Sequence, residues 1–312
     1  MLFGEYSVIC NSMGLTIPYA HFKGELNFLN KFRYTDYDFA MKSNRLIKDY
    51  YTYLEELNAD DNFKCEIDLK TLEKDLNKGL YFESTIPQGY GIGSSGALVA
   101  AIYERYARGK IKSTRRIQKE NITELKTLFS KMESYFHGIS SGIDPLHCYI
   151  KFPLLIRNQS DIEIVDIPRK QYPKDGAIFL LNTGKPGKTQ PLVKLFFSKC
   201  KNDSFKELIE NELIPLNDNC INTLLTANTD DFMQNLKQLS VFQINHFKQM
   251  IPDDYQYIWK EGLEQDLFSL KLCGSGGGGF ILAFTKDYSR AVNEFRKQKI
   301  KFITVFKSFT DN

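Results

Sequence analysis

The sequence predicts a two-domain α+β protein, and three observations support this class. The chain has 312 residues, which is more than one hydrophobic core usually accommodates. Strand-like and helix-like patterns are mixed without the regular βαβα alternation of a doubly wound sheet. In residues 150–175, short strand-like runs alternate with Pro and Lys. This composition shift places the domain boundary near residue 165, so we expect domains at 1–165 and 166–312.

The first domain is expected to begin with a strand, LFGEYSVI, and to contain a second strand that leads into a glycine-rich loop at 87–97. Apolar residues at helical spacing predict three helices, with Ser43 and Asn121 as N-terminal caps and Gly138 as a stop signal. The expected elements are strands at 2–9 and 79–85 and helices at 43–57, 97–107 and 121–138.

The second domain is expected to contain a strand followed by a long helical region and a strand–loop–strand unit. The loop of that unit is again rich in glycine, and a helix and a terminal strand follow it. The expected elements are a strand at 176–184, helices within 190–265, apolar runs on both sides of the loop 273–280, a helix at 287–298 and a strand at 301–308.

The composition is that of a globular protein, with 42% hydrophobic and 25% charged residues. No apolar run approaches the roughly 18 residues that suggest a membrane span. The N-terminus has no basic segment ahead of an apolar stretch, and the six cysteines are scattered without a CxxC pair. We therefore expect a cytoplasmic protein with reduced thiols and no membrane partner. The net charge of +3 and the local basic clusters predict no nucleic-acid partner.

The first glycine loop, PQGYGIGSSGA at 87–97, lies between a predicted strand and a predicted helix. Backbone N–H groups at a helix start have no partner within the helix, and the helix dipole places partial positive charge there. Glycines let these donors approach an anion without Cβ atoms in the way. The serines add hydroxyls that can bind Mg²⁺ beside phosphate oxygens. The loop therefore favours a phosphate site over a flexible turn.

Two common phosphate motifs do not fit this chain. Residues 91–96 (GIGSSG) satisfy G-x-G-x-x-G, but the region that should hold a strand and an acidic residue is polar and basic, IKSTRRIQKEN. A P-loop needs four residues between its glycines, whereas GKPGKT at 184–189 has two. Neither a dinucleotide site of the Rossmann type nor a Walker A site is therefore expected.

The second loop, CGSGGGGF at 273–280, is longer and richer in glycine than a hairpin needs. This favours a close approach of its backbone to a ligand or to the first loop over a flexible hairpin tip. Between the loops lie two carboxylates of interest. Glu133 is close to the C-terminal end of a predicted helix, and Asp144 follows a Gly-Ser turn. Such carboxylates can hold Mg²⁺ or act as a general base, although each alone is more often a surface or turn residue.

Together these stretches resemble the GHMP kinase superfamily, and within it the mevalonate kinases. LFGEYSV is similar to the N-terminal motif K-hydrophobic-hydrophobic-L-x-G-E-H-x-V-V, and PQGYGIGSSGA to the phosphate loop P-x-G-x-G-L-G-S-S-A. KLCGSGGGGF resembles K-x-T-G-A-G-G-G-G-C, and residues 133–144 keep the spacing of E-x-x-x-H-G-x-P-S-G-x-D. NTGKPGKT at 182–189 resembles N-T-x-x-P-x-x-T with its proline shifted by one residue.

The resemblance implies a two-domain GHMP kinase fold, with an N-terminal ATP-binding domain like ribosomal protein S5 domain 2 and a ferredoxin-like C-terminal domain with extra helices. It implies the cofactors ATP and Mg²⁺, with Asp144 orienting or deprotonating the acceptor hydroxyl. Ser95 and Glu133 would hold the metal, and Glu5, Tyr6 and Thr183 would lie near the acceptor. The implied ATP-binding residues are Pro87, Gly89, Gly91, Gly93, Ser94, Ser95, Gly274, Gly276 and Gly277.

Four departures from the family pattern matter. The family's lysine, six residues before the first motif's Glu, is missing, and we expect Met1 to be an internal methionine of a longer protein. Tyr6 stands where the pattern has His, which leaves the acceptor open. Gly96 replaces the usual Ala, and Ser140 replaces the Pro before Ser-Gly.

The resemblance implies an ATP-dependent kinase for a small hydroxylated metabolite, with mevalonate as the leading acceptor. Phosphomevalonate, a sugar or homoserine is the alternative acceptor. Because the lysine is absent, a non-catalytic nucleotide-binding protein is the alternative from another class. A homodimer is left open.

Overall fold

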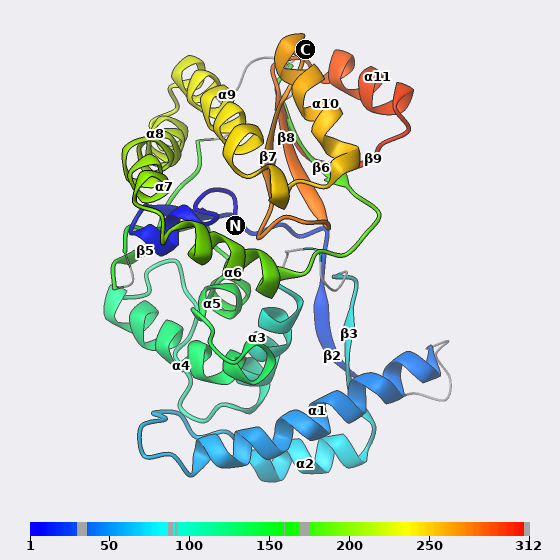
Figure 1. Cartoon of the computed structure of the whole chain (residues 1–312). Coiled ribbons are helices and arrows are strands. Elements are labelled where there is room, and N and C mark those ends of the chain that lie inside the picture. Colours follow the sequence, from blue (N-terminus) through cyan, green and yellow to red (C-terminus); the bar gives the residue numbers. More distant parts are fainter. Residues whose placement is uncertain (30–35, 87–89, 91–92, 159, 169–174, 309–312) are drawn as a thin grey trace.

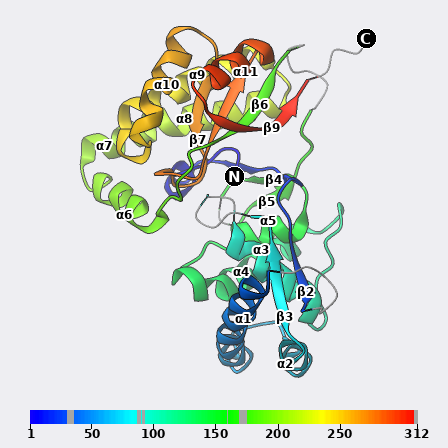
Figure 2. The same ribbon diagram turned by 90° about the vertical axis from the view of Figure 1, so that its right-hand side faces the viewer.

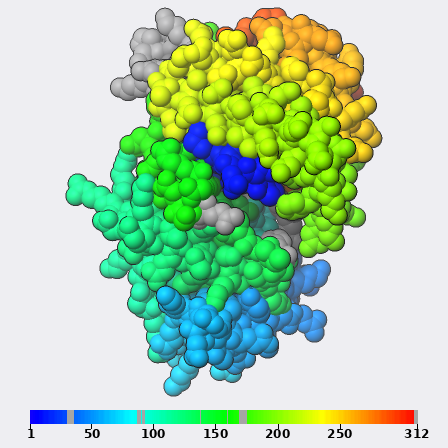
Figure 3. All heavy atoms as spheres, turned by 60° about the vertical axis from the view of Figure 1, so that its left-hand side comes forward, coloured from blue at the N-terminus to red at the C-terminus, as the bar shows by residue number. Residues whose placement is uncertain are grey.

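The computed structural model describes residues 1–29, 36–86, 90, 93–158, 160–168 and 175–308. The chain forms two stacked halves, and its N-terminal residues lie between them (Figure 1). In the space-filling view, the blue N-terminal residues are visible at the surface, between yellow residues of the second half and green residues below them (Figure 3). Mixed helices and sheets in two halves confirm the predicted α+β class.

The first half combines five helices with two small antiparallel sheets. One sheet is the antiparallel pair β2–β3, whose strands are separated in the chain by two helices, and the other has the order β1–β4–β5. The strands are β1 (Gly14–Thr16), β2 (Gly24–Phe28), β3 (Leu80–Ser84), β4 (Leu154–Ile156) and β5 (Ile162–Ile164). The helices are α1 (Tyr37–Asn58), α2 (Leu69–Asn77), α3 (Ser94–Tyr106), α4 (Lys119–His137) and α5 (Ile143–Ile150).

The core of the first half is built where α1, α3, α4 and α5 meet. Tyr103 of α3 packs edge-to-face on Phe129 of α4 and on Tyr149 of α5, with ring centroids 5.1 and 5.0 Å apart. Tyr50 of α1 is fully buried, and its hydroxyl donates to the Met132 carbonyl of α4 at 3.0 Å. These contacts hold α4 and α5, the helices that carry both predicted carboxylates, against α1 and α3.

The second half is one antiparallel sheet with the order β7–β8–β6–β9, flanked by helices (Figure 2). The strands are β6 (Ala177–Asn182), β7 (Ser269–Leu272), β8 (Phe280–Thr285) and β9 (Lys301–Lys307). The helices are α6 (Thr189–Lys199), α7 (Asp203–Leu208), α8 (Ile214–Leu225), α9 (Thr229–His246), α10 (Asp253–Glu264) and α11 (Tyr288–Lys297).

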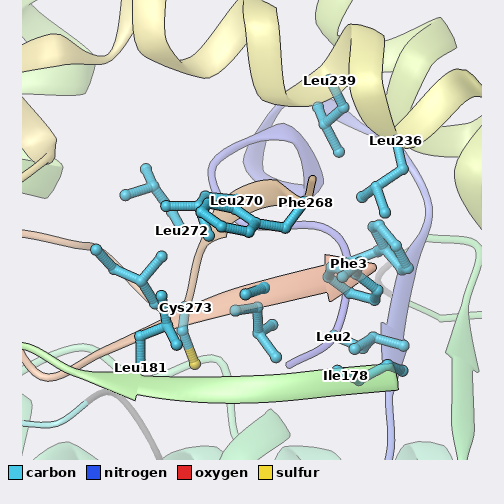
Figure 4. Close-up of a cluster of buried hydrophobic side chains, with 14 of the residues drawn as sticks. Leu2, Phe3, Ile178, Leu181, Leu236, Leu239, Phe268, Leu270, Leu272 and Cys273 are labelled. Carbon is cyan, nitrogen blue, oxygen red and sulfur yellow. The ribbon is translucent and has the colours of Figure 1, made fainter. Parts of the chain in front are cut away.

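The two faces of this sheet are covered differently. Phe295 of α11 packs edge-to-face on Phe179 of β6, with centroids 5.3 Å apart. Phe284 of β8 pairs with the residue before Phe179, so its side chain points to the opposite face, where it contacts Phe232 of α9 and Phe3. Figure 4 shows Leu2 and Phe3 among these apolar side chains below α9. The N-terminal segment is therefore part of the second half's core.

The strand predicted at 2–9 is wrong. Phe3 forms an isolated bridge with Leu15, after which the chain turns into a short 3₁₀ helix, Ser7–Cys10. Gly4 has a φ of 113° and Tyr6 a φ of 65°, and these angles do not occur in a strand. The residues from Leu2 to Ser7 are all buried, so the aromatic and β-branched composition reflects burial on all sides instead of a strand.

The other predicted elements are present, with different helix starts. The N-cap of α1 is Asp36, whose side chain accepts from Phe39 N, while Ser43 donates its hydroxyl to the Phe82 carbonyl. Helix α4 begins before Asn121, and Gly138 is its C-cap as predicted. Helix α3 begins at Ser94, three residues before the predicted start.

Buried apolar residues form two clusters, one mainly within residues 47–164 and one mainly within 177–295. Four N-terminal residues and Leu155 belong to the second cluster, so the chain crosses between the halves before residue 165. The boundary near 165 stays a prediction. Among the described residues, no helix has the length and apolar character needed to cross a membrane.

Candidate active site

The start of α3 lies directly behind the first glycine loop. Gly93 precedes the helix with a φ of 72°, a left-handed conformation that favours glycine. Ser94 and Ser95 form the beginning of the helix, where backbone N–H groups lack partners within the helix and the dipole favours an anion. The arrangement suits phosphate oxygens. Pro87, Gly89 and Gly91 fall outside the described residues, and their role in ATP binding stays a prediction.

Glu133 of α4 reaches the start of α3. Its side chain is buried, with Oε1 accepting from Ser95 Oγ at 3.0 Å and Oε2 accepting from the Ser140 hydroxyl. Burial, together with the nearby charge of Asp144, raises the pKa of Glu133 to about 7, against the two hydroxyl donors, which lower it. The structure therefore brings together the two residues predicted to hold Mg²⁺, which are 38 positions apart.

Asp144 lies in the first turn of α5 and is exposed. A Cβ placed on Gly93 would lie 3.3 Å from Asp144 Cγ, so the carboxylate is beside the start of α3. A Cβ on Gly96 would lie only 2.7 Å from the Asp144 carbonyl carbon. Glycine at these two positions therefore permits the close approach that places the carboxylate beside the start of α3.

This close approach gives a first prediction. Gly96→Ala should destabilise the protein, although the same change in a helix normally stabilises it by roughly 0.5–1 kcal/mol. The added Cβ would collide with the backbone at Asp144 and Pro145, and moving α5 away would also displace the carboxylate. Urea unfolding should show lower stability, with turnover reduced as well. Glu104→Ala, at an exposed position of α3, is the control, and equal stability of both variants and wild type would contradict this account.

The oxygen donors around Ser95 fit Mg²⁺. A hydroxyl and a carboxylate already lie within hydrogen-bond distance, and both are hard ligands of the kind this cation prefers. In the described part of the chain, no group of three or more His, Cys, Asp or Glu side chains could hold a metal by itself. Mg²⁺ usually takes one or two protein ligands and completes its shell with water and substrate phosphates. The donor set is thus suited to a metal that arrives with a nucleotide.

The raised pKa of Glu133 gives a second prediction. Between pH 4.5 and about 7 the folded protein retains this proton while the unfolded chain releases it, so the contribution of Glu133 to stability falls as pH rises. Burial lowers the pKa of His147 from 6.5 to about 4, so between these pH values the unfolded chain binds a proton that the folded protein does not. The contribution of His147 to stability therefore rises with pH. Glu133→Gln removes only the first contribution.

The stability of Glu133→Gln relative to wild type should therefore increase from pH 4.5 to 7 and level off above. Urea unfolding at several pH values without metal measures this difference. Glu124→Gln, at an exposed position of the same helix, is the matched control. A difference that is constant with pH would contradict the assigned pKa.

The second glycine loop approaches the first one. A Cβ placed on Gly279 would lie 2.6 Å from Tyr90 Cα, so the two loop backbones are in direct contact. Positive φ angles of 68–75° at Gly274, Gly276 and Gly277 shape this loop. The loop-to-loop approach expected from the sequence is present. Direct binding of ATP by Gly274, Gly276 and Gly277 stays a prediction.

Thr183 holds the second loop from the other side. Its backbone N–H and its hydroxyl both donate to the Gly279 carbonyl, at 3.0 and 2.8 Å. Gly279 N in turn donates to the Lys185 carbonyl at 2.7 Å. The Thr183 hydroxyl is thus engaged in positioning the loop, and its predicted contact with an acceptor stays a prediction.

Glu5 and Tyr6 lie in the N-terminal turn between the halves. The Tyr6 hydroxyl donates to the Ser275 carbonyl at 2.6 Å, and its buried ring packs between Phe196 and Phe247. Burial raises the pKa of Tyr6. With its proton donated to Ser275, the Tyr6 oxygen can still accept a hydrogen bond, and its predicted contact with an acceptor stays a prediction.

Glu5 forms an ion pair that the sequence analysis missed. Lys271 of β7 places Nζ 2.5 Å from Glu5 Oε2, and both side chains are buried, with exposed fractions of 1% and 4%. Lys271 Nζ also donates to the Leu272 carbonyl at 2.7 Å, whereas Glu5 Oε1 has no hydrogen-bond partner among the described residues. A lysine between two leucines, next to the second loop, was the available signal in the sequence.

Residues 46–150 match the family model of the GHMP kinases N terminal domain. This part of the chain is therefore similar to the N-terminal domain of the GHMP kinases. The predicted resemblance is thereby confirmed, and the matched residues contain the first glycine loop, Glu133 and Asp144. No curated protein sequence matches the chain.

Solved GHMP kinases share the fold along the whole chain. Mevalonate kinase from L. major, solved in complex with R-mevalonate, has a TM-score of 0.62 at 18% identity, over 99% of this chain and 94% of that one. Lactococcus lactis galactokinase, complexed with galactose, has a TM-score of 0.64 at 15% identity, over 99% of this chain and 91% of the galactokinase chain. Streptococcus pneumoniae phosphomevalonate kinase, in complex with phosphomevalonate and AMPPNP, has a TM-score of 0.61 at 13% identity, over 97% of each chain. These similarities confirm the predicted two-domain GHMP kinase fold.

Proposed function

We propose that this protein is an ATP- and Mg²⁺-dependent kinase that transfers the γ-phosphoryl group to a hydroxyl of a small metabolite. The observation that carries the proposal is the Ser95–Glu133 pair at the start of α3, with Asp144 against the same turn. Phosphoryl transfer depends mainly on positioning and charge neutralisation. Backbone donors at a helix start, hard oxygen ligands for a metal and one exposed carboxylate supply these requirements.

Each residue has a distinct role in this proposal. Ser95 and Glu133 hold Mg²⁺, which neutralises charge on the phosphates when it is bound with the nucleotide. The backbone at Gly93 and Ser94 binds phosphate oxygens. Asp144 orients the acceptor hydroxyl and accepts its proton. Its position in an exposed first turn leaves room for an acceptor to reach it.

For the acceptor we propose mevalonate. The spacing from Glu133 to Asp144 matches the mevalonate kinase motif, and mevalonate kinase is among the structures with this fold. Glu5 Oε1, buried and without a partner among the described residues, is the oxygen we assign to an acceptor hydroxyl. Thr183 and Tyr6 contribute by holding the second loop in place.

A coupled ADP-release assay over mevalonate, phosphomevalonate, homoserine and galactose tests the proposal. We expect the largest turnover with mevalonate, and its loss when Mg²⁺ is removed by a chelator. If turnover is largest with another of these acceptors, the protein is still a kinase, but mevalonate is not its substrate. ATP binding without turnover on any of them would favour a non-catalytic nucleotide-binding protein. The cytoplasmic location and the homodimer stay predictions.

A further inference from the structure

Tyr90 occupies an unusual position in the first glycine loop. In the pattern P-x-G-x-G-L-G-S-S-A this residue stands at a variable position, so the shape of the loop does not require an aromatic side chain. Tyr90 is nevertheless half-buried and packs against the hydrophobic core of the second half. The loop that leads into α3 of the first half is therefore attached to the other half of the molecule.

The main contact of Tyr90 is with Phe280. The two rings meet edge-to-face with centroids 5.2 Å apart and an interplanar angle of 62°. Phe280 begins β8, is 1% exposed, and also contacts Phe22 at 5.6 Å. Phe280 stands where the family pattern K-x-T-G-A-G-G-G-G-C has a small Cys. An aromatic residue at a variable position of the first loop and an aromatic residue in place of the Cys of the second loop are thus in contact.

The surface that receives Tyr90 is itself held in place. Gly279 contacts the Tyr90 backbone, and its carbonyl accepts two hydrogen bonds from Thr183. Gly279 has a φ of 71°, and a Cβ there would lie 2.6–2.8 Å from three backbone atoms of Tyr90. The Tyr90 ring and backbone are therefore fixed by two adjacent residues of one well-bonded segment.

From this geometry we infer that Tyr90 is a positioning residue, which anchors the phosphate loop on Gly279 and Phe280 of the second half. The inference rests on the proposed function, because the anchored loop is the one assigned to ATP. An anchored loop pays less conformational entropy when it binds phosphates. Loss of the anchor should weaken nucleotide binding while the chemistry at Asp144 is retained.

Tyr90→Leu and Phe280→Leu, prepared in the full-length chain, test this role. We expect each to weaken the affinity for Mg-ADP by roughly 3- to 10-fold, as judged from the strength of edge-to-face aromatic pairs, with a higher KM for ATP and a kcat close to wild type. The double variant should be little worse than either single one, because both remove the same contact. Tyr90→Phe should bind like wild type, since the inferred anchor uses the ring.

Tyr288→Leu is the matched control. Tyr288 is also partly buried against the second core, where its ring stacks on Phe179 with centroids 5.5 Å apart. Its loss should lower thermal stability and leave Mg-ADP affinity unchanged. If Tyr90→Leu behaves in the same way, the side chain merely fills space and the inference is overturned.

A second measurement keeps the anchor testable without nucleotide. Hydrogen exchange at the amides of Tyr90 and Gly93 should become faster in Tyr90→Leu and stay unchanged in Tyr288→Leu. Unchanged exchange in Tyr90→Leu would refute the anchor. If the wild-type protein binds no Mg-ADP or Mg-ATP, the proposed function fails, and the exchange experiment still decides whether Tyr90 holds the loop.

Discussion

Asp144→Asn should reduce turnover by about 10²- to 10⁴-fold, the range in which a general base normally contributes. The amide keeps the size of the side chain beside Gly93 but cannot accept the hydroxyl proton. Nucleotide affinity should stay close to wild type, because the proposed metal ligands are Ser95 and Glu133. ADP release and Mg-ADP titration measure the two effects separately. Full activity of the variant would exclude Asp144 as the base.

The same variant has a second, independent readout. The charge of Asp144 contributes to the raised pKa of Glu133, so this pKa should fall in Asp144→Asn. An NMR titration of the Glu133 carboxyl would measure the change without any acceptor. Asp166→Asn, with a side chain 82% exposed and paired with Arg115, is the control and should alter neither activity nor this pKa. A Glu133 pKa that is unchanged in Asp144→Asn would contradict the placement of the two carboxylates.

Lys271→Met should lower the free energy of unfolding by about 3–5 kcal/mol, the cost expected when one partner of a buried ion pair is removed. Methionine is similar in length, so packing in β7 is largely retained, while the Glu5 carboxylate loses its counter-charge. Urea unfolding measures the loss. Lys286→Met is the matched control on the surface, where Lys286 is 56% exposed and only 4.0 Å from Asp230 Oδ1. Its effect should stay within about 0.5 kcal/mol.

The double variant Glu5→Gln/Lys271→Met separates the charge from the packing. A neutral amide at residue 5 no longer needs a buried counter-charge, so the double variant should recover part of the lost stability. Equal stability of the single and double variants would show that the ion pair is not the source of the effect. The pair joins residues 266 positions apart, so these variants also test how the N-terminal turn is held on β7.

Most elements could be predicted from local sequence, because periodic apolar residues and turn signals act over short distances. Residues 121–138 are an example, since their apolar stripe predicted the helix α4 and Gly138 predicted where it ends. Residues 2–9 show the failure. There, the burial of residues 2–7 accounts for the strand-like composition, while Gly4 and Tyr6 have positive φ angles and Tyr6 belongs to the core of the second half.

For the candidate site, too, some features could be predicted from the sequence and others needed the tertiary structure. The sequence by itself determined the chemical groups, namely a glycine loop before a helix, a second glycine loop and two carboxylates in a motif of known spacing. Only the tertiary structure decided which groups meet, such as Ser95 with Glu133 and Gly96 with the Asp144 backbone. It also revealed the Glu5–Lys271 pair and the contact of Tyr90 with Phe280. The physical reason is that residue types and spacing along the chain are local, whereas ion pairs and ring contacts between distant segments depend on how the two halves pack.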